Sequence, residues 1–320
     1  MSKTKNLAIY RPNGAAAEYS TWACNLYNGC SHTCVYCYCK RGVFGHTLGK
    51  DVPEVKTQLG GNPDKAYSLF CQELNKYHDQ IIADGGLFFS FSTDPMLREE
   101  IDLTMRCVLY ALENKVPVSI LTKATWWVRV DWIIGSLWQY RDILRLGFTF
   151  TGHDEMEPGA PSNVSRQTAL IYLHKMQFRT FASMEPIIDF VSSLAVIRTI
   201  ATDCNEFRIG LLSPFRKDRY KPEHCSRFIL AVDTIAKEHG FVVYWKQSVR
   251  RYVNDYVLPF LCTEADAFAG SDMGLDYAQK ASDIQRIIPP VPSPAVPNRS
   301  ACGNIVTMPN ESLIGENNPL

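Results

Sequence analysis

The sequence has no long apolar segment. Nowhere in its 320 residues is there a run of about 18 consecutive apolar residues, the length that a membrane-spanning helix needs. The opening segment, MSKTKNLAIYRPNG, also lacks the apolar core of a secretory signal peptide. These two absences argue against membrane insertion and secretion, so we expect a cytoplasmic protein without a membrane partner.

The sequence also lacks a GxxxxGK phosphate loop and any net charge, since 33 Lys and Arg residues balance 33 Asp and Glu residues. The balance conceals a pattern, because residues 1–50 hold six basic side chains against one acidic, and residues 206–251 hold ten against five. The segments 51–205 and 252–320 are each five charges negative. The two basic segments are therefore candidates for one basic surface.

Short apolar runs alternate with amphipathic stretches from about residue 86 onward, a pattern typical of βα units around a parallel sheet. The predicted strands are 87–92, 116–122, 146–151, 179–183, 206–212 and 241–245. Helices are predicted between them, the first capped by Asp94 at its N-terminus and the last closed by Gly240.

This series predicts an α/β fold, a partial (β/α)6-type TIM-like barrel over residues 21–251. An N-terminal extension (1–20) and a C-terminal extension (252–320) flank it, and the Pro-rich run PPVPSPAVP in the latter suits neither a helix nor an inner strand. Every candidate active residue follows a predicted strand, where α/β barrels build their sites.

Three of the eleven cysteines, Cys30, Cys34 and Cys37, form a C-x3-C-x2-C motif in NGCSHTCVYCYCK, in a loop that we place before the first βα unit. Three thiolates do not close a structural zinc site, but they suit an iron–sulfur cluster that leaves one iron open to a small molecule. The odd cysteine count disfavours a disulfide scaffold. The alternative is a zinc site completed by Cys24, His32 or Cys39.

The motif resembles that of the radical S-adenosylmethionine (SAM) enzymes, which usually place an aromatic residue before the third cysteine, here Tyr36. The resemblance implies a 4Fe-4S cluster held by Cys30, Cys34 and Cys37, with SAM bound at its open iron. It also implies an external electron donor such as flavodoxin or ferredoxin, and a 5′-deoxyadenosyl radical that abstracts hydrogen from a substrate.

The runs FSFSTDP (89–95), ILTK (120–123) and MEPIIDF (184–190) resemble the spore photoproduct lyase-like branch, over residues 21–215. The resemblance implies that Thr93, Lys123 and Thr149 hold SAM and that Tyr36 lies beside its adenine. An ammonium suits the SAM carboxylate, and hydroxyls suit its amino and ribose groups. Phe91 stands where that branch has a cysteine hydrogen donor, which puts repair of the thymine photoproduct in doubt.

A weaker resemblance, through SMEP (183–186) and YWKQ (244–247), is to phage-associated radical SAM-like proteins of unknown activity. Glu185 ends a predicted strand, so we expect an acid/base group or a substrate contact there. The alternative is that Glu185 accepts backbone hydrogen bonds before Pro186.

Three hypotheses for function remain open. The first is an enzyme acting on a nucleic acid or nucleotide, with basic side chains near the phosphates: Arg216, Lys217, Arg219, Lys221, Lys246, Arg250 and Arg251. The second is a noncatalytic zinc- or cluster-binding module. The third is a radical SAM enzyme acting on a peptide or small metabolite, and the lack of a cysteine-rich auxiliary domain disfavours the peptide version.

Overall fold

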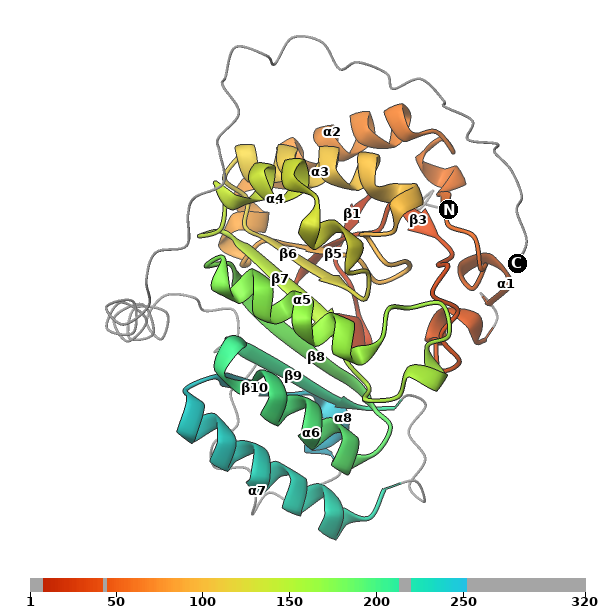
Figure 1. Cartoon of the computed structure of the whole chain (residues 1–320). Coiled ribbons are helices and arrows are strands. Elements are labelled where there is room, and N and C mark those ends of the chain that lie inside the picture. Colours follow the sequence, from red (N-terminus) through yellow and green to blue (C-terminus); the bar gives the residue numbers. More distant parts are fainter. Residues whose placement is uncertain (1–7, 43–44, 213–219, 252–320) are drawn as a thin grey trace, which may run out of the picture.

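A computed structural model describes residues 8–42, 45–212 and 220–251 of the chain (Figure 1). Its core is an eight-stranded sheet in the order β1-β2-β5-β6-β7-β8-β9-β10. The strands are β1 (Ile9–Tyr10), β2 (Trp22–Cys24), β5 (Leu87–Phe89), β6 (Val118–Thr122), β7 (Leu144–Thr149), β8 (Arg179–Ile187), β9 (Glu206–Leu211) and β10 (Val242–Trp245). Only β1 is antiparallel to its neighbour, so seven parallel strands run in chain order.

A helix connects each of these parallel strands to the next, and Figure 1 shows the helices lining one side of the sheet. The helices are α2 (Pro63–Ala83), α3 (Ile101–Glu113), α4 (Asp131–Trp138), α5 (Asn163–Lys175), α6 (Phe190–Ile200) and α7 (Pro222–His239), besides the short α1 (Gly45–Leu48) and α8 (Gln247–Arg250). A small hairpin pairs β3 (Tyr27–Asn28) with β4 (Glu54–Val55). The predicted partial (β/α)6 barrel is therefore confirmed, and within the described residues β1 and β10 do not pair to close it.

The predicted start of the series was wrong. β2 precedes the strand that we expected first and pairs parallel to β5, so the three-cysteine loop lies inside the first βα unit, between β2 and α2. Three residues are too few to show a period-two pattern, and only pairing with β5 makes them a strand. The other end was predicted correctly, because Gly240 closes α7 with a left-handed backbone at φ 76°.

The two faces of the sheet differ in character because successive side chains of a strand point to opposite sides. On the helix-covered face, Phe89 of β5 packs against Phe70 of α2 in the main apolar core. A smaller cluster on the other face consists of Tyr19, Ala23, Phe88 and Phe181. The register continues that face from Phe88 to Ser119 and Arg145, so the inner face combines aromatic and polar side chains.

Residues 11–20 follow β1 and cross to the far edge of the sheet. Arg208 of β9 donates to the carbonyl oxygens of Glu18 (3.1 Å) and Tyr19 (2.9 Å). Lys246, directly after β10, donates to the carbonyl of Ala15 (3.1 Å). Part of the predicted N-terminal extension therefore packs against the inner face of the barrel.

Two further predictions concern the C-terminal segment and the membrane. The predicted C-terminal extension, 252–320, lies outside the described residues. None of the helices in the described part is both long enough and apolar enough to cross a membrane.

Candidate active site

The three-cysteine loop is held against the carboxyl ends of the strands by its backbone. Cys30 N–H donates to the carbonyl of Lys50 (2.9 Å), and Val35 N–H donates to the carbonyl of Met156 (2.9 Å) in the loop after β7. Gly159 lies so close to the cysteine loop that a Cβ there would come within 2.4 Å of the Ser31 carbonyl oxygen. A glycine is therefore required at this contact, which ties the end of β7 to the cysteines.

The three thiols differ in acidity. Burial raises the pKa of Cys30 to about 12 and also raises the pKa of Cys34, because a buried thiolate loses its hydration. The side-chain contact with the neighbouring Cys39 thiol lowers the pKa of Cys37 to about 6. Metal ligation requires thiolates, and Cys37 is the cysteine that reaches this form most easily.

Two of the three candidate fourth ligands for a zinc ion make other contacts. His32 bonds both Asp94 and the Gly159 carbonyl, and Cys39 donates to the Phe91 carbonyl (3.7 Å). Within the described residues, no three His, Cys, Asp or Glu side chains are placed as ligands of one metal ion. Cluster cysteines each bind a different iron, so their sulfur atoms need not converge on one point.

Asp94 joins the cysteine loop to two strand ends. Its buried carboxylate accepts hydrogen bonds from four groups: His32 Nε2 (2.8 Å), Thr122 Oγ1 (2.6 Å), Lys123 N–H (2.6 Å) and Met96 N–H (2.9 Å). Burial raises its pKa, but His32 and these donors outweigh that effect and hold the pKa below its usual range. The prediction that Asp94 caps a helix was wrong, because α3 begins at Ile101, and three of the four bonds of Asp94 come from distant residues.

The residues predicted to hold SAM line one edge of the sheet. Thr93 follows β5, Lys123 follows β6 and Thr149 ends β7. Within the described residues, the buried hydroxyl of Thr93 has no hydrogen-bond partner, which is expected where a ligand supplies the missing bond. The Lys123 ammonium lies 5.6 Å from the centre of the Tyr36 ring, so it faces the residue predicted to lie beside the adenine.

Sequence reasoning missed the charged centre of this edge. Glu157 is fully buried and accepts hydrogen bonds from Tyr36 Oη, from the buried Arg166, and from Thr151 Oγ1 (3.1 Å). Its carboxylate also lies 3.9 Å from the Lys123 ammonium. We call Tyr36, Lys123, Thr151, Glu157 and Arg166 the Glu157 cluster.

The Glu157 cluster contains two cationic side chains and one carboxylate. Burial raises the pKa of Glu157, but Lys123 and Arg166 lower it by a larger amount, so the carboxylate is ionised. Cys34 and Glu157 likewise raise the pKa of Lys123 against the effect of burial. Arg166 also lies 3.8 Å from the half-exposed carboxylate of Asp154, so the cations outnumber the carboxylates only in the buried part of the cluster. In the sequence, Glu157 and Arg166 belong to the run EPGAPSNVSRQ, 157–167. Its pattern, an acidic residue in a turn followed by an Arg at the start of a helix, was the only sequence signal for this ion pair.

Glu185 lies on β8 at the inner face. Its Oε2 atom accepts hydrogen bonds from Tyr19 Oη (2.7 Å) and Lys246 Nζ (2.6 Å), two side chains rather than the backbone groups considered as the alternative. We call Glu18, Tyr19, Ser183, Glu185 and Lys246 the Glu185 cluster. Lys246 was predicted to lie near phosphates, and this was wrong, because its side chain is only 2% exposed and ion-paired.

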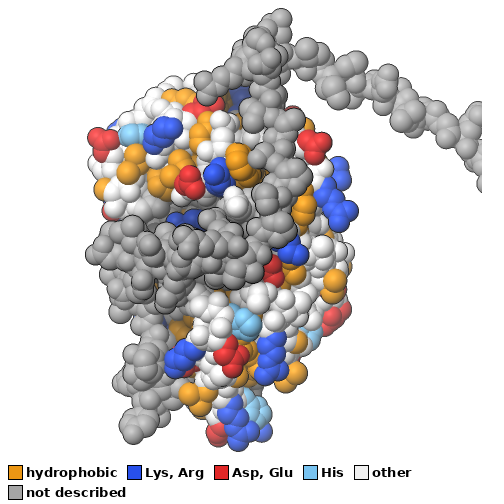
Figure 2. Space-filling view, turned by 60° about the vertical axis from the view of Figure 1, so that its left-hand side comes forward, with side chains coloured by type: hydrophobic (Ala, Val, Ile, Leu, Met, Phe, Trp, Pro, Cys, Tyr) orange, Lys and Arg blue, Asp and Glu red, His pale blue; other side chains and the backbone are white. Residues whose placement is uncertain are grey.

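The other basic residues do not form a cluster in the described part of the chain. Lys221 and Arg251 are exposed, and the Arg250 guanidinium lies 5.5 Å from the centre of the Tyr244 ring. On the face in Figure 2, the described Lys and Arg side chains are scattered among acidic and apolar ones. Arg216, Lys217 and Arg219 lie outside the described residues.

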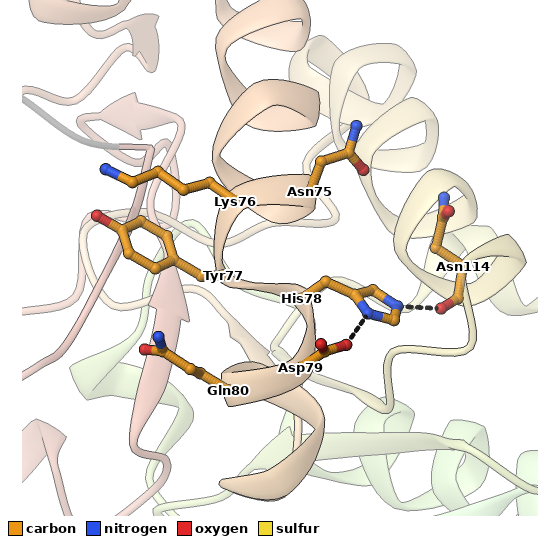
Figure 3. A pocket seen from close by; sticks show the side chains of 7 residues that line it. All are labelled: Asn75, Lys76, Tyr77, His78, Asp79, Gln80 and Asn114. Atoms are coloured by element: carbon orange, nitrogen blue, oxygen red, sulfur yellow. Dashed lines mark hydrogen bonds and ion pairs between the residues drawn. The ribbon is translucent and has the colours of Figure 1, made fainter.

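A hollow of about 390 Å³ lies away from all these residues (Figure 3). Side chains of residues 75–80 of α2 and Asn114 line it, and His78 links them by bonding Asp79 (2.8 Å) and the Asn114 carbonyl (2.8 Å). Asn114 precedes β6, so the hollow is at the amino end of the strands. Barrel sites form at the carboxyl end, and we do not assign this hollow to the active site.

Comparison with known proteins gave similarity in structure only. No protein-family model matches the sequence, and no curated protein does. Spore photoproduct lyase complexed with dinucleoside spore photoproduct matches with a TM-score of 0.54 and 14% identity, covering 77% of this chain and 81% of that chain. A double mutant of that lyase with bound AdoMet and the same dinucleoside matches with a TM-score of 0.54, 15% identity and the same coverage.

Identities this low establish the fold alone. The chain has the fold of spore photoproduct lyase, and the resemblance to that branch of radical SAM proteins, carried in the sequence by its motifs, is confirmed at the level of the fold.

Proposed function

We propose that the chain is a radical SAM enzyme. One observation carries the proposal: the C-x3-C-x2-C loop follows the first parallel strand of a partial barrel and packs against the strand ends that bear Thr93 and Lys123. Cys30, Cys34 and Cys37 would hold a 4Fe-4S cluster. When bound, the cluster and SAM supply the 5′-deoxyadenosyl radical that abstracts hydrogen from the substrate.

The Glu157 cluster would bind the SAM carboxylate. Lys123 and Arg166 bring two positive charges to one buried carboxylate, and a further ion-pair partner of Arg166, Asp154, is half-exposed. The excess of buried positive charge attracts an anionic ligand in a medium of low dielectric. The Thr93 hydroxyl would gain its missing partner from SAM, and Thr149 would contribute at the end of β7. Because Glu157 holds Tyr36 by its hydroxyl, the Tyr36 ring has a defined orientation for the adenine.

The proposal includes partners outside the chain. A one-electron donor such as flavodoxin or ferredoxin would reduce the cluster, and we propose that the protein works in the cytoplasm. For the substrate we favour a nucleic acid or nucleotide, since the matching lyase structures hold a dinucleoside. Phe91 at the position of the branch's cysteine argues against the same repair reaction. A peptide or small metabolite is the second candidate.

Anaerobic reconstitution with iron and sulfide, followed by reduction in the presence of SAM, tests the proposal. We expect a brown protein that releases 5′-deoxyadenosine. A protein that instead binds one zinc ion per chain tightly and releases no 5′-deoxyadenosine would contradict it and favour the noncatalytic module.

A further inference from the structure

Two sequence motifs without a role in the SAM site meet in the barrel. Glu185 belongs to SMEP on β8, and Lys246 belongs to YWKQ at the end of β10, 61 residues later. Their charged atoms lie 2.6 Å apart, and Lys246 is almost completely buried. Removing an ammonium and a carboxylate from water has a large desolvation penalty that pairing offsets only in part, so stability alone does not explain the pair.

The Lys246 ammonium is held by two hydrogen bonds and a second carboxylate nearby. It donates to Glu185 Oε2 and to the Ala15 carbonyl (3.1 Å), and it lies 3.7 Å from Glu18 Oε2. It also lies 4.3 Å from the centre of the Tyr19 ring, a favourable cation–π distance. These contacts fix the ammonium, and through it one oxygen of Glu185.

The hydroxyl of Tyr19 makes the second bond to that oxygen. Its single proton goes to Glu185 Oε2 (2.7 Å), so in the contact with Ser183 (2.6 Å) the serine hydroxyl is the donor. Oε2 therefore receives two hydrogen bonds from side chains that are themselves held in place. The carboxylate cannot rotate without breaking both.

The other oxygen of Glu185 is open. Within the described residues, Oε1 accepts no hydrogen bond, and the Glu185 side chain is 22% exposed. Oε1 packs against Gly210 of β9, where a Cβ would come within 2.8 Å of it, so the glycine is what permits this position of the carboxylate. The cluster thus presents one fixed acceptor on the inner face.

A series of contacts connects this acceptor to the cysteine loop. The centre of the Tyr19 ring is 5.9 Å from that of Phe91, and Phe91 stacks on Phe88 at 4.6 Å with the ring planes 13° apart. The Phe91 carbonyl accepts a hydrogen bond from the Cys39 thiol. Phe91 is partly exposed, so a flat aromatic surface lies between the cysteine loop and Glu185.

We propose that Glu185 recognises the substrate, accepting with Oε1 a hydrogen bond from an N–H group on the edge of a nucleobase that stacks near Phe91. Tyr19 and Lys246 are positioning residues that hold the carboxylate. This inference rests on the proposed function and names the part of a nucleotide substrate that enters the barrel. Aromatic rings stack on any base, and carboxylates accept from base N–H groups. A carboxylate repels phosphate, so the base edge and not the backbone faces Glu185.

The test uses single-stranded deoxyoligonucleotides of one length as probes: four homopolymers and an abasic strand. Binding to the reconstituted protein is measured by fluorescence anisotropy at low salt. All five strands carry the same phosphates, so a difference among them reports base contacts. We expect at least one homopolymer to bind about 10-fold tighter than the other homopolymers or more, the effect of one hydrogen bond to a charged group. Stacking is common to all four bases, and the abasic strand measures it separately.

Glu185→Gln should remove most of this preference, and Tyr19→Phe should reduce it by several-fold. Lys246→Met leaves Glu185 without its cation and should also lose stability. Adding Glu185→Gln to Lys246→Met removes both charges, so this double variant should recover thermal stability while the base preference stays lost. Lys237→Met, an exposed lysine on α7 paired with Asp233, is the control for the change of charge and should bind as the parent does.

Three outcomes would overturn the inference: no base preference in the parent, an unchanged preference in Glu185→Gln, or a parent-like preference in the double variant. Release of 5′-deoxyadenosine by the parent is measured in parallel without oligonucleotide. It tests the proposed function separately, because SAM cleavage in the absence of substrate does not depend on Glu185.

Discussion

The Glu157 cluster and the Glu185 cluster bury charge with opposite balance. In the Glu157 cluster, Lys123 and Arg166 share one fully buried carboxylate, and the second carboxylate near Arg166, that of Asp154 at 3.8 Å, is half-exposed to solvent. In the Glu185 cluster, Lys246 lies between the carboxylates of Glu18 and Glu185, both mostly buried. Cations therefore outnumber carboxylates in the buried part of the first cluster, and carboxylates outnumber the cation in the second. Two sites of opposite sign on one barrel suit two different ligands, an anionic group at the cysteine side and a hydrogen-bond donor at the far side.

The largest expected effect is loss of the iron–sulfur cluster when a cysteine of the C-x3-C-x2-C motif is replaced. Cys30→Ala, Cys34→Ala and Cys37→Ala should each abolish cluster assembly, because three thiolates hold it, and iron and sulfide analysis after reconstitution measures this. Cys24→Ala and Cys39→Ala should leave the iron content largely intact. Cys71→Ala, on α2, is the control for a cysteine outside the loop. Iron loss in Cys39→Ala equal to that in Cys37→Ala would show that Cys39 is a ligand.

The next largest expected effect is a loss of stability, which should differ between the Glu157 cluster and the Glu185 cluster. Among the described residues, Glu157→Gln leaves the two cations of the cluster with only the half-exposed Asp154 as a counter-charge. Breaking a buried ion pair in this way costs about 3 to 5 kcal/mol. Glu185→Gln should cost less, because Lys246 keeps the nearby Glu18 carboxylate. Urea unfolding measures both, with Glu155→Gln as an exposed control. Equal losses of stability in the two variants would show that the clusters do not differ in how their buried cations are neutralised.

Lys123→Ala should weaken SAM binding while sparing the iron–sulfur cluster. Loss of a charge-assisted hydrogen bond corresponds to about 1.5 to 3 kcal/mol, or roughly 10- to 150-fold in Kd. Equilibrium dialysis with labelled SAM measures the change, and Lys65→Ala, an exposed lysine on α2, is the control. The oligonucleotide base preference should not change. An unchanged SAM Kd would return Lys123 to a purely structural role beside Glu157.

The smallest expected effect is a pH-dependent loss of stability at an ion pair between the loop after β7 and the start of α6. His153, after β7, bonds Asp189 at the start of α6 as well as Glu155. The bond to Asp189 is the largest cause of a raised pKa at His153, and Glu155 adds to it. A raised pKa means that this contribution to stability is present below the unfolded pKa of about 6.5 and is lost as pH rises through the folded value.

His153→Gln should therefore lower the free energy of unfolding by under about 1 kcal/mol near pH 6 and by less near pH 9. In the acidic range the pattern reverses, because the pKa values of Asp189 and Glu155 are lowered and their contribution is lost as pH falls through them. Urea unfolding of parent and variant across this range checks the sign. A destabilisation that grew from pH 6 to pH 9 would contradict the ion-pair account.

Local patterns in the sequence predict the order of the helices and strands and identify residues at the strand ends. Apolar periodicity is a local property, so it predicted six of the seven parallel strands. It also placed Thr93 and Lys123 where β5 and β6 end. The cysteine spacing is equally local, and it indicates an iron–sulfur cluster without any knowledge of how the chain folds.

The burial of charge, by contrast, depends on contacts that form only in the folded chain. The sequence predicted Asp94 as a helix cap and Lys246 as a phosphate contact, and it gave Glu157 no role. Each instead lies among partners up to 231 residues distant. A charged side chain leaves water only when such partners satisfy it, and they come from strands that the barrel brings together and that no local pattern connects.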